Sequence, residues 1–220
     1  MKPKDEKKAA RTDRVRSTDH PLVAHHVCIL RDRRTPPEGF RAALRRLSVL
    51  LAYEAARDLP LEHTVVETPL APAPAGRLDL RVGLVPILRA GLGMVDPILD
   101  LIPGAEVWHL GFYRDEQTRK PVEYYCKLPE GRPVEVAMVL DPMLATGGSA
   151  CAALQALADW GVPQIRLLSM IAAPEGIAAV HARFPNVWIH VAAVDEKLNR
   201  DAFIVPGLGD AGDRQFNAPA

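Results

Sequence analysis

The sequence predicts an α/β protein built around a central parallel sheet that is flanked by helices. From residue 81 onward, short and continuously apolar segments alternate with segments of helical periodicity. Unbroken apolar strands are typical of a parallel sheet that is covered on both faces. Glycine-containing loops follow several of these strands, and such sheets bind ligands at the carboxyl ends of their strands. With 220 residues, the chain is long enough for one domain with a full core.

The N-terminal segment, residues 1–19, is rich in Lys, Arg, Asp and Glu and has no apolar face. We expect it to be a disordered, charged tail, with a nucleic-acid-binding arm or a targeting signal as the functional alternative. Residues 20–220 are expected to form a single domain.

The first predicted helix contains Phe40–Glu54, where side chains recur at three- and four-residue steps after a start signal at Pro37 and Glu38. It should end near Asp58–Pro60. Three prolines and one glycine in residues 69–76, PLAPAPAG, predict a loop without regular structure.

The alternating region predicts five strands, at Arg81–Val85, Val107–Gly111, Val134–Leu140, Ile165–Ile171 and Val187–Ala193. Helices are predicted from about Gly91, from Ser149 to Trp160 and from Glu175 to Phe184. The polar segment between Phe112 and Leu128 interrupts this alternation and predicts an exposed hairpin or flap. The end of the chain, FIVPGLGDAGDRQF, predicts a further glycine-rich loop.

The overall composition does not favour a function that involves binding to a polyanion. The 27 basic residues balance the 27 acidic residues, which gives no indication of a nucleic-acid or membrane-surface partner. No segment resembles a signal peptide or a membrane span, so we expect a cytoplasmic protein. Cys28, Cys126 and Cys151 are far apart and lack zinc-ligand spacing, and we expect them to be reduced, structural thiols.

The segment VLDPMLATGGS, residues 139–149, predicts an anion site. A glycine-containing loop between an apolar strand and a helix places backbone N–H groups and the hydroxyls of Thr146 and Ser149 around a concavity. Gly147 and Gly148 permit positive φ and a close approach of the backbone to the ligand. The loop has no Lys and does not match a nucleotide P-loop or a dinucleotide-binding fingerprint. A phosphate is the most natural ligand.

Asp141 would repel that phosphate unless its carboxylate serves another group. A ribose 5-phosphate satisfies both requirements, because the carboxylate can accept hydrogen bonds from the 2- and 3-hydroxyls. The alternative is a tight turn with an Asp cap, and this motif alone leaves both interpretations open.

Two arginines are predicted at the same edge of the sheet. Arg89 follows an apolar strand in VPILRAGLGM, and Arg114 follows another in GFYRDE. Beside a phosphate loop, each could bind a second anion. The alternatives are a surface arginine that caps a turn and a solvated flap residue.

Five segments, in this order, resemble the uracil phosphoribosyltransferases, a branch of the type I phosphoribosyltransferases: VPILRAGLGM, YRDEQTRKPVEYYCKLP, LDPMLATGGS, AAPEGI and IVPGLGDAGDR. The resemblance extends from about residue 20 to the C-terminus. Pro142 favours the uracil branch, because a second acid usually follows the first in the other type I enzymes. The resemblance implies the type I fold, with a central parallel sheet flanked by helices, a protruding hairpin or flap, and a small C-terminal hood that binds the base.

The resemblance implies the reaction of uracil with 5-phosphoribosyl 1-diphosphate (PRPP) to give UMP and diphosphate, with Mg²⁺. It implies catalytic roles for Arg89, Arg114 and Asp141. The implied PRPP-binding residues are Arg89, Arg114, Asp141, Pro142, Met143, Leu144, Ala145, Thr146, Gly147, Gly148, Ser149 and Asp210. The implied uracil-binding residues are Ile204, Gly209, Asp210 and Ala211.

Other expectations concern the metal, the base and the partners. No second acid follows Asp141, so we expect Mg²⁺ to be held mainly by PRPP oxygens and water, without a dedicated protein ligand. Backbone N–H and C=O groups of Gly209–Ala211 are expected to bind the N3–H, O2 and O4 of uracil. Cytosine has an amino group at position 4, which would place a hydrogen-bond donor against a buried donor. We expect a homodimer or homotetramer and no nucleic-acid or membrane partner, and GTP is a candidate effector.

The sequence departs from the family pattern near the expected base site, at DEKLNRDAF and at the C-terminal QFNAPA. Two alternatives therefore stay open. One is a phosphoribosyltransferase for another base, and the other is a regulatory nucleotide-binding protein of the same fold without turnover.

Overall fold

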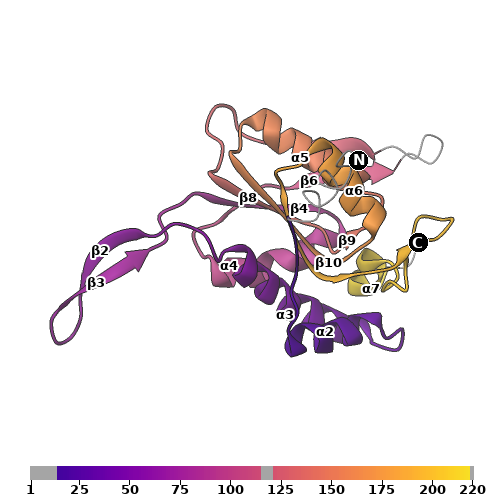
Figure 1. Ribbon diagram of the computed structural model, residues 1–220, viewed down its shortest axis with the longest axis horizontal. Coiled ribbons are helices and arrows are strands. Elements are labelled where there is room, and N and C mark those ends of the chain that lie inside the picture. Colours follow the sequence, from indigo (N-terminus) through magenta and orange to yellow (C-terminus); the bar gives the residue numbers. More distant parts are fainter. Residues whose placement is uncertain (1–13, 115–120, 219–220) are drawn as a thin grey trace, which may run out of the picture.

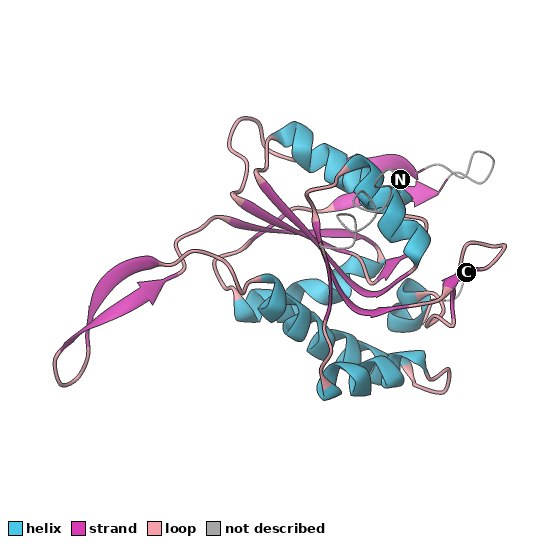
Figure 2. Cartoon of the chain, in the orientation of Figure 1, coloured by secondary structure: helices cyan, strands magenta, loops and turns pink. Residues whose placement is uncertain are grey.

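The computed structural model describes residues 14–114 and 121–218, although the side chains of residues 113, 114 and 121–123 lie outside this description. Its centre is a nine-stranded sheet with helices on both faces (Figures 1 and 2). The strands of this sheet are β1 (Val15–Ser17), β4 (Val82–Leu88), β5 (Glu106–Val107), β6 (Leu110–Arg114), β7 (Pro121–Cys126), β8 (Val136–Leu140), β9 (Met143–Leu144), β10 (Gln164–Ala172) and β11 (Trp188–Val194).

The order along the main path of the sheet is β1-β11-β10-β8-β4-β6-β7, with β5 beside β4 and β9 beside β10. Within this sheet the described pairings are parallel except that of β6 with β7, which forms the hairpin predicted between Phe112 and Leu128. Residues 115–120, between β6 and β7 in the sequence, lie outside the described part. The predicted parallel sheet is confirmed.

Two layers of helices cover the sheet (Figure 1). One face carries α2 (Pro21–Arg31), α3 (Pro37–Ala55), the 3₁₀ turn η1 (Ala90–Met94), α4 (Val95–Leu101) and α7 (Ala211–Phe216), and the other carries α5 (Gly148–Trp160) and α6 (Pro174–Arg183). Each layer buries its own apolar cluster against the strands, with Leu44 and Leu47 in one and Leu154 and Leu157 in the other. The predicted helices after Phe40, Ser149 and Glu175 are confirmed.

The local sequence explains where these elements begin and end. All of β8 is buried, as its unbroken apolar sequence predicts. α5 begins after Gly147 and ends before Gly161, and both of these flanking glycines have positive φ. The segment predicted as one strand at Val107–Gly111 is divided in two, because β5 pairs with Gly83–Leu84 and β6 pairs with Ile87–Leu88.

The predicted tail at residues 1–19 is wrong for its C-terminal part. Val15–Ser17 form β1, which pairs in parallel with β11 at the edge of the sheet, and the guanidinium of Arg16 lies over the Trp188 ring at 4.4 Å. Without β1, the outer edge of β11 would have unpaired N–H and C=O groups. β1 pairs with these groups, and the local composition of residues 15–17 does not reveal such partners. Residues 1–13 lie outside the described part.

The predicted loop at residues 69–76 is also wrong. Pro72–Arg77 form β3, which pairs antiparallel with β2 (Glu62–Glu67) in an arm that projects from the body of the molecule (Figure 1). Pro72 and Pro74 occupy alternate positions, so both ring nitrogens lie on the same side of the strand. A two-stranded ribbon tolerates this, because the outward-facing positions need no N–H donor.

A short antiparallel pair and a helix close the carboxyl edge of the sheet. β12 (Lys197–Leu198) pairs with β13 (Ile204–Val205), and α7 follows. We call residues 197–216 the hood. Within the described residues, each helix is too short or too polar to cross a membrane.

Packing of α3 against the sheet should dominate stability on its face. Leu47 is fully buried, so Leu47→Ala should lower the free energy of unfolding by about 2–5 kcal/mol in chemical denaturation. Leu22, on α2, is 53% exposed, and Leu22→Ala should change it by less than about 0.5 kcal/mol. Equal effects of the two substitutions would contradict this packing.

Candidate functional site

The candidate site lies at the carboxyl edge of the sheet, where parallel pairing brings two predicted loops together. β4 and β8 pair with Val85 opposite Val139 and Pro86 opposite Leu140, so Arg89 and Asp141 leave the sheet at the same edge. A cavity of about 350 Å³ lies between these loops, and we call it the loop cavity. The predicted residues that line it are Arg89, Asp141, Met143, Leu144, Ala145, Thr146, Gly147, Gly148, Ser149 and Asp210.

Pro142 does not line the loop cavity. It is buried, and its carbonyl oxygen accepts hydrogen bonds from the N–H groups of Met170 and Ile171 at 3.1 Å. The backbone at Pro142 therefore fixes the loop to β10.

The glycine loop, residues 141–149, presents backbone to the loop cavity. Gly147 has φ 79° and ψ 0° and caps α5, whose first residues also line the cavity. A Cβ on Gly147 would lie 2.9 Å from the carbonyl oxygen of Gly176, so a larger residue would clash as well as strain the backbone. First-turn N–H groups of a helix lack intrahelical partners and attract anions. The loop is thus suited to a phosphate.

Asp141 has an unusual protonation equilibrium. Burial, with a smaller contribution from the nearby Asp210 carboxylate, raises its pKa to about 7, although a hydrogen bond from the Met143 N–H at 3.2 Å opposes the shift. A carboxyl group whose pKa is shifted close to neutral pH, beside an anion site, is a typical feature of functional sites.

Arg89 is directed toward the hood. Its Nη2 lies 2.9 Å from Oδ1 of Asp213 on α7, and its side chain is 57% exposed. This contact connects the β4 loop to the C-terminal segment. Sequence reasoning missed Asp213, although it stands in the recognised GDAGDR segment. Arg114 ends β6, but its side chain lies outside the described part.

A second cavity of about 190 Å³ adjoins the loop cavity, and we call it the hood cavity. Ile204 and Gly209, two predicted base-site residues, line it, and Met143 and Ala145 line both cavities. Ala211 lines neither cavity and is fully buried at the start of α7. Asp201, Ala202 and Phe203 also line the hood cavity and were not predicted. Their only sequence signal is their position in the segment that departs from the family pattern.

The metal-binding capacity of the site is limited. Among the described residues, Asp141 and Asp210 are the carboxylates that line the loop cavity. In the described part of the chain, no three or more His, Cys, Asp or Glu side chains gather as a metal cluster. Mg²⁺ commonly binds through one or two carboxylates, substrate phosphates and water, so these donors fit a metal that arrives with a phosphorylated substrate.

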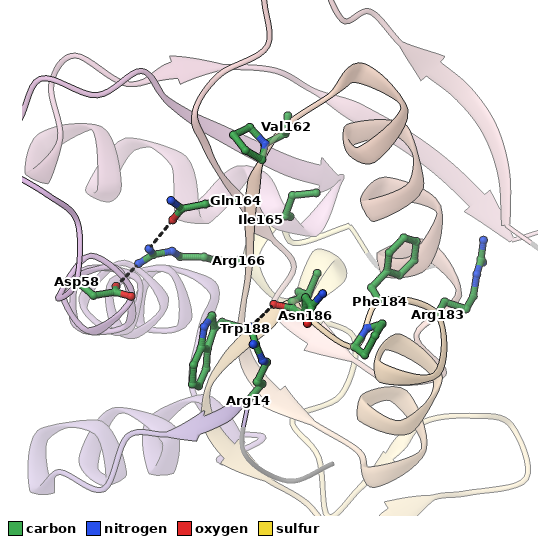
Figure 3. Close-up of a pocket in the computed structure, with 13 residues that line it drawn as sticks. Arg14, Asp58, Val162, Gln164, Ile165, Arg166, Arg183, Phe184, Asn186 and Trp188 are labelled. Carbon is green, nitrogen blue, oxygen red and sulfur yellow. Dashed lines mark hydrogen bonds and ion pairs between the residues drawn. The ribbon is translucent and has the colours of Figure 1, made fainter. Parts of the chain in front are cut away.

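A cavity of about 510 Å³ lies at the opposite edge of the sheet, where β10 and β11 begin (Figure 3). Arg14 and Arg166, two of its charged side chains, already have partners. Arg166 donates to Asp58 Oδ1 at 2.7 Å and to the Ala55 carbonyl, and Arg14 donates to the Asn186 carbonyl at 2.9 Å. These contacts stabilise the edge of the sheet, and none involves the candidate site.

Comparisons with known proteins agree with this geometry. Residues 17–218 match the family model described as uracil phosphoribosyltransferase. A uracil phosphoribosyltransferase from Roseiflexus sp. (strain RS-1) is 60% identical over 199 residues, covering 90% of this chain and 96% of the relative. Another, from Thermoanaerobacter sp. (strain X514), is 54% identical over 202 residues, covering 90% and 95%.

A solved structure of the AQ2163 protein from Aquifex aeolicus has a TM-score of 0.88 and 38% sequence identity, and the match covers 94% of this chain and 99% of that chain. The family model spans both cavities, the hood and the sheet except for Val15 and Arg16 at its edge. The chain belongs to the uracil phosphoribosyltransferase family.

Proposed function

We propose that this protein transfers the 5-phosphoribosyl group of PRPP to uracil, giving UMP and diphosphate. The main observation in support is that the loop cavity and the hood cavity adjoin and share Met143 and Ala145. A phosphorylated sugar in one and a planar base in the other would bring their reacting atoms together at this junction. Such positioning is a large part of what an enzyme supplies to a two-substrate reaction.

The glycine loop would hold the 5-phosphate on the first-turn N–H groups of α5 and the hydroxyls of Thr146 and Ser149. Asp141 would accept hydrogen bonds from the ribose 2- and 3-hydroxyls. Its raised pKa supports this role, because hydroxyl donors stabilise the ionised form that burial alone disfavours. Asp210 lines the same cavity and would face the sugar from the hood.

Displacement at the anomeric carbon passes through an oxocarbenium-like state while negative charge gathers on the departing diphosphate. Arg89 and Arg114 would stabilise that charge, and Mg²⁺ bound to the diphosphate would supply further charge neutralisation. Arg89 is paired with Asp213 in this structure, so diphosphate would compete with or share that contact. A covalent nucleophile is not required.

Backbone groups of residues 209–211 would read the base. Uracil offers one N–H donor between two carbonyl acceptors, and cytosine places an amino donor where uracil has a carbonyl. A buried N–H that faces the cytosine amino group would lose its partner, which disfavours cytosine.

We also propose that the protein acts as a homo-oligomer, a dimer or tetramer, in the cytoplasm. The β2–β3 arm supports assembly, because it exposes Val65 and Val66, which lie on opposite faces of the ribbon, and Leu70 in its turn, at exposures of 66%, 37% and 96%. Exposed aliphatic side chains on a projecting ribbon are typical of an element that a second copy covers. Activation by GTP stays a prediction of the family resemblance.

Product formation with a panel of bases tests the function. Purified protein is incubated with PRPP, Mg²⁺ and one of uracil, cytosine, thymine, hypoxanthine or orotate, and nucleotide and diphosphate are measured. We expect product with uracil alone. Product with hypoxanthine or orotate would indicate a phosphoribosyltransferase for another base, and the absence of product with every base would favour a regulatory protein.

Asp141→Asn should lower activity and raise stability. Activity should fall roughly 10- to 100-fold, because a charged acceptor for the ribose hydroxyls is lost. In the unfolded chain Asp141 ionises near pH 4, whereas in the folded protein its pKa is raised to about 7. The free energy of unfolding of the wild type therefore falls as pH rises from about 4 to about 7. The variant should therefore have the higher thermal midpoint at pH 8, and the difference should vanish near pH 4.

The control for this experiment is Asp100→Asn, whose carboxylate side chain is 81% exposed. It should change neither activity nor stability measurably. An Asp141→Asn protein with activity within about twofold of wild type, or with a lower midpoint at pH 8, would contradict the role of Asp141.

Charged substitutions on the arm should break the assembly. Val65→Glu combined with Leu70→Glu should reduce the mass measured by light scattering to that of a smaller species, with an unchanged circular dichroism spectrum. Glu67→Gln, on the same arm, should keep the wild-type mass. A wild-type protein that is already monomeric, or a double variant of unchanged mass, would refute the role of the arm.

A further inference from the structure

Residues 204–211, which we call the base loop, are anchored from behind by the end of α2. Arg31, the last residue of α2, donates from Nη1 to the Gly207 carbonyl and to Asp195 Oδ2, each at 2.9 Å. Its Nη2 also donates to Asp195 Oδ1. The Gly207 N–H in turn donates to Asp195 Oδ2 at 2.9 Å. Arg31, Asp195 and Gly207 therefore form a closed ring that binds both backbone polar groups of Gly207.

This ring is well placed to be rigid. The side chain of Asp195 is 3% exposed and that of Arg31 is 25% exposed, so the pair is only partly screened by solvent. A bidentate contact between guanidinium and carboxylate also fixes orientation as well as distance. The Asp195 N–H donates to the Ala172 carbonyl at 2.8 Å, which connects the ring to the carboxyl end of β10.

Arg214 makes a second connection between the same two segments. Its Nη1 donates to the Leu208 carbonyl at 2.8 Å and also to the Leu30 carbonyl, and its Nη2 donates to the Asp32 carbonyl at 2.7 Å. The guanidinium lies 4.5 Å from the centre of the Phe40 ring. The carbonyl groups at the end of α2 thus hold α7 and the residue after Gly207.

We propose that Arg31 is a positioning residue for base recognition, acting through Asp195 and Gly207. This inference depends on the proposed function, in which backbone groups of residues 209–211 read the base. Backbone N–H and C=O groups are the same in every residue except proline, so their selectivity for a base depends on the position in which the loop holds them. Gly207 lies between Ile204 and Gly209, which line the hood cavity, and Arg31 lines neither cavity of the site.

The chain offers a matched control for a merely structural role. Arg166 and Asp58 form a similar pair at the far edge of the sheet, where Arg166 donates to Asp58 Oδ1 and to the Ala55 carbonyl. Both arginines thus bind a carboxylate and a backbone carbonyl. Each pair has one buried partner, which is Arg166 at 5% exposure beside Asp58 at 55% in the control, and Asp195 in the Arg31 pair. The pairs also differ in location, because only that of Arg31 contacts the base loop.

The test compares the Michaelis constants of two double variants, Arg31→Met/Asp195→Asn and Arg166→Met/Asp58→Asn. Replacing both partners avoids an unpaired buried charge. We expect the first to raise the KM for uracil at least fivefold and to leave the KM for PRPP within twofold of wild type. The second should lower the thermal midpoint and leave both constants within twofold. Arg31→Lys should give an intermediate KM for uracil, because one ammonium group cannot reproduce the planar fork.

Three outcomes would overturn the proposal: an unchanged KM for uracil in the Arg31 double variant, equal increases for uracil and PRPP, or the same increase in the control pair. If the Arg31 double variant does not fold, the KM values for uracil and PRPP of Arg31→Lys are compared with those of the wild type, and the same outcomes decide. Failure of wild-type protein to form UMP would instead refute the proposed function, so the two failures are distinguishable.

Discussion

The parallel pairing of β4 with β8 is the constraint on which the site depends. It places the residues after Leu88 beside the residues after Leu140, so a cationic loop and an acidic glycine loop share one edge of the sheet. Gly91 has no room for a Cβ, which would overlap the Leu140 carbonyl. The close approach of the two loops is therefore fixed by backbone packing before any ligand binds.

The hood completes the site through contacts that cross the sequence. Arg89 reaches Asp213 on α7, while Arg31 and Arg214 connect the end of α2 to residues 207 and 208. These contacts join the N-terminal helix, the central loops and the C-terminal segment around two adjoining cavities. A site divided in this way can hold a phosphorylated sugar with one segment and a base with another, and still bring the two reactants to one junction.

The sequence predicted the elements whose signals are local. β8 is continuously apolar and α5 lies between glycines, so both were found close to their observed bounds. β1 and β3 were missed because their stability comes from partner strands, β11 and β2, and local composition argued against them. The glycine loop carried its own chemical signal. The contacts of Arg89 with Asp213 and of Arg31 with Asp195 and Gly207 each join residues more than 120 positions apart, and only the fold brings these residues together.

The central claim is that the glycine loop binds the 5-phosphate and the base loop reads the base. A crystal structure with UMP bound tests it most directly. We predict the phosphate on the backbone of residues 146–149, the ribose hydroxyls on Asp141 and the base against residues 209–211. A phosphate bound elsewhere, or a base that makes no contact with the base loop, would contradict the claim.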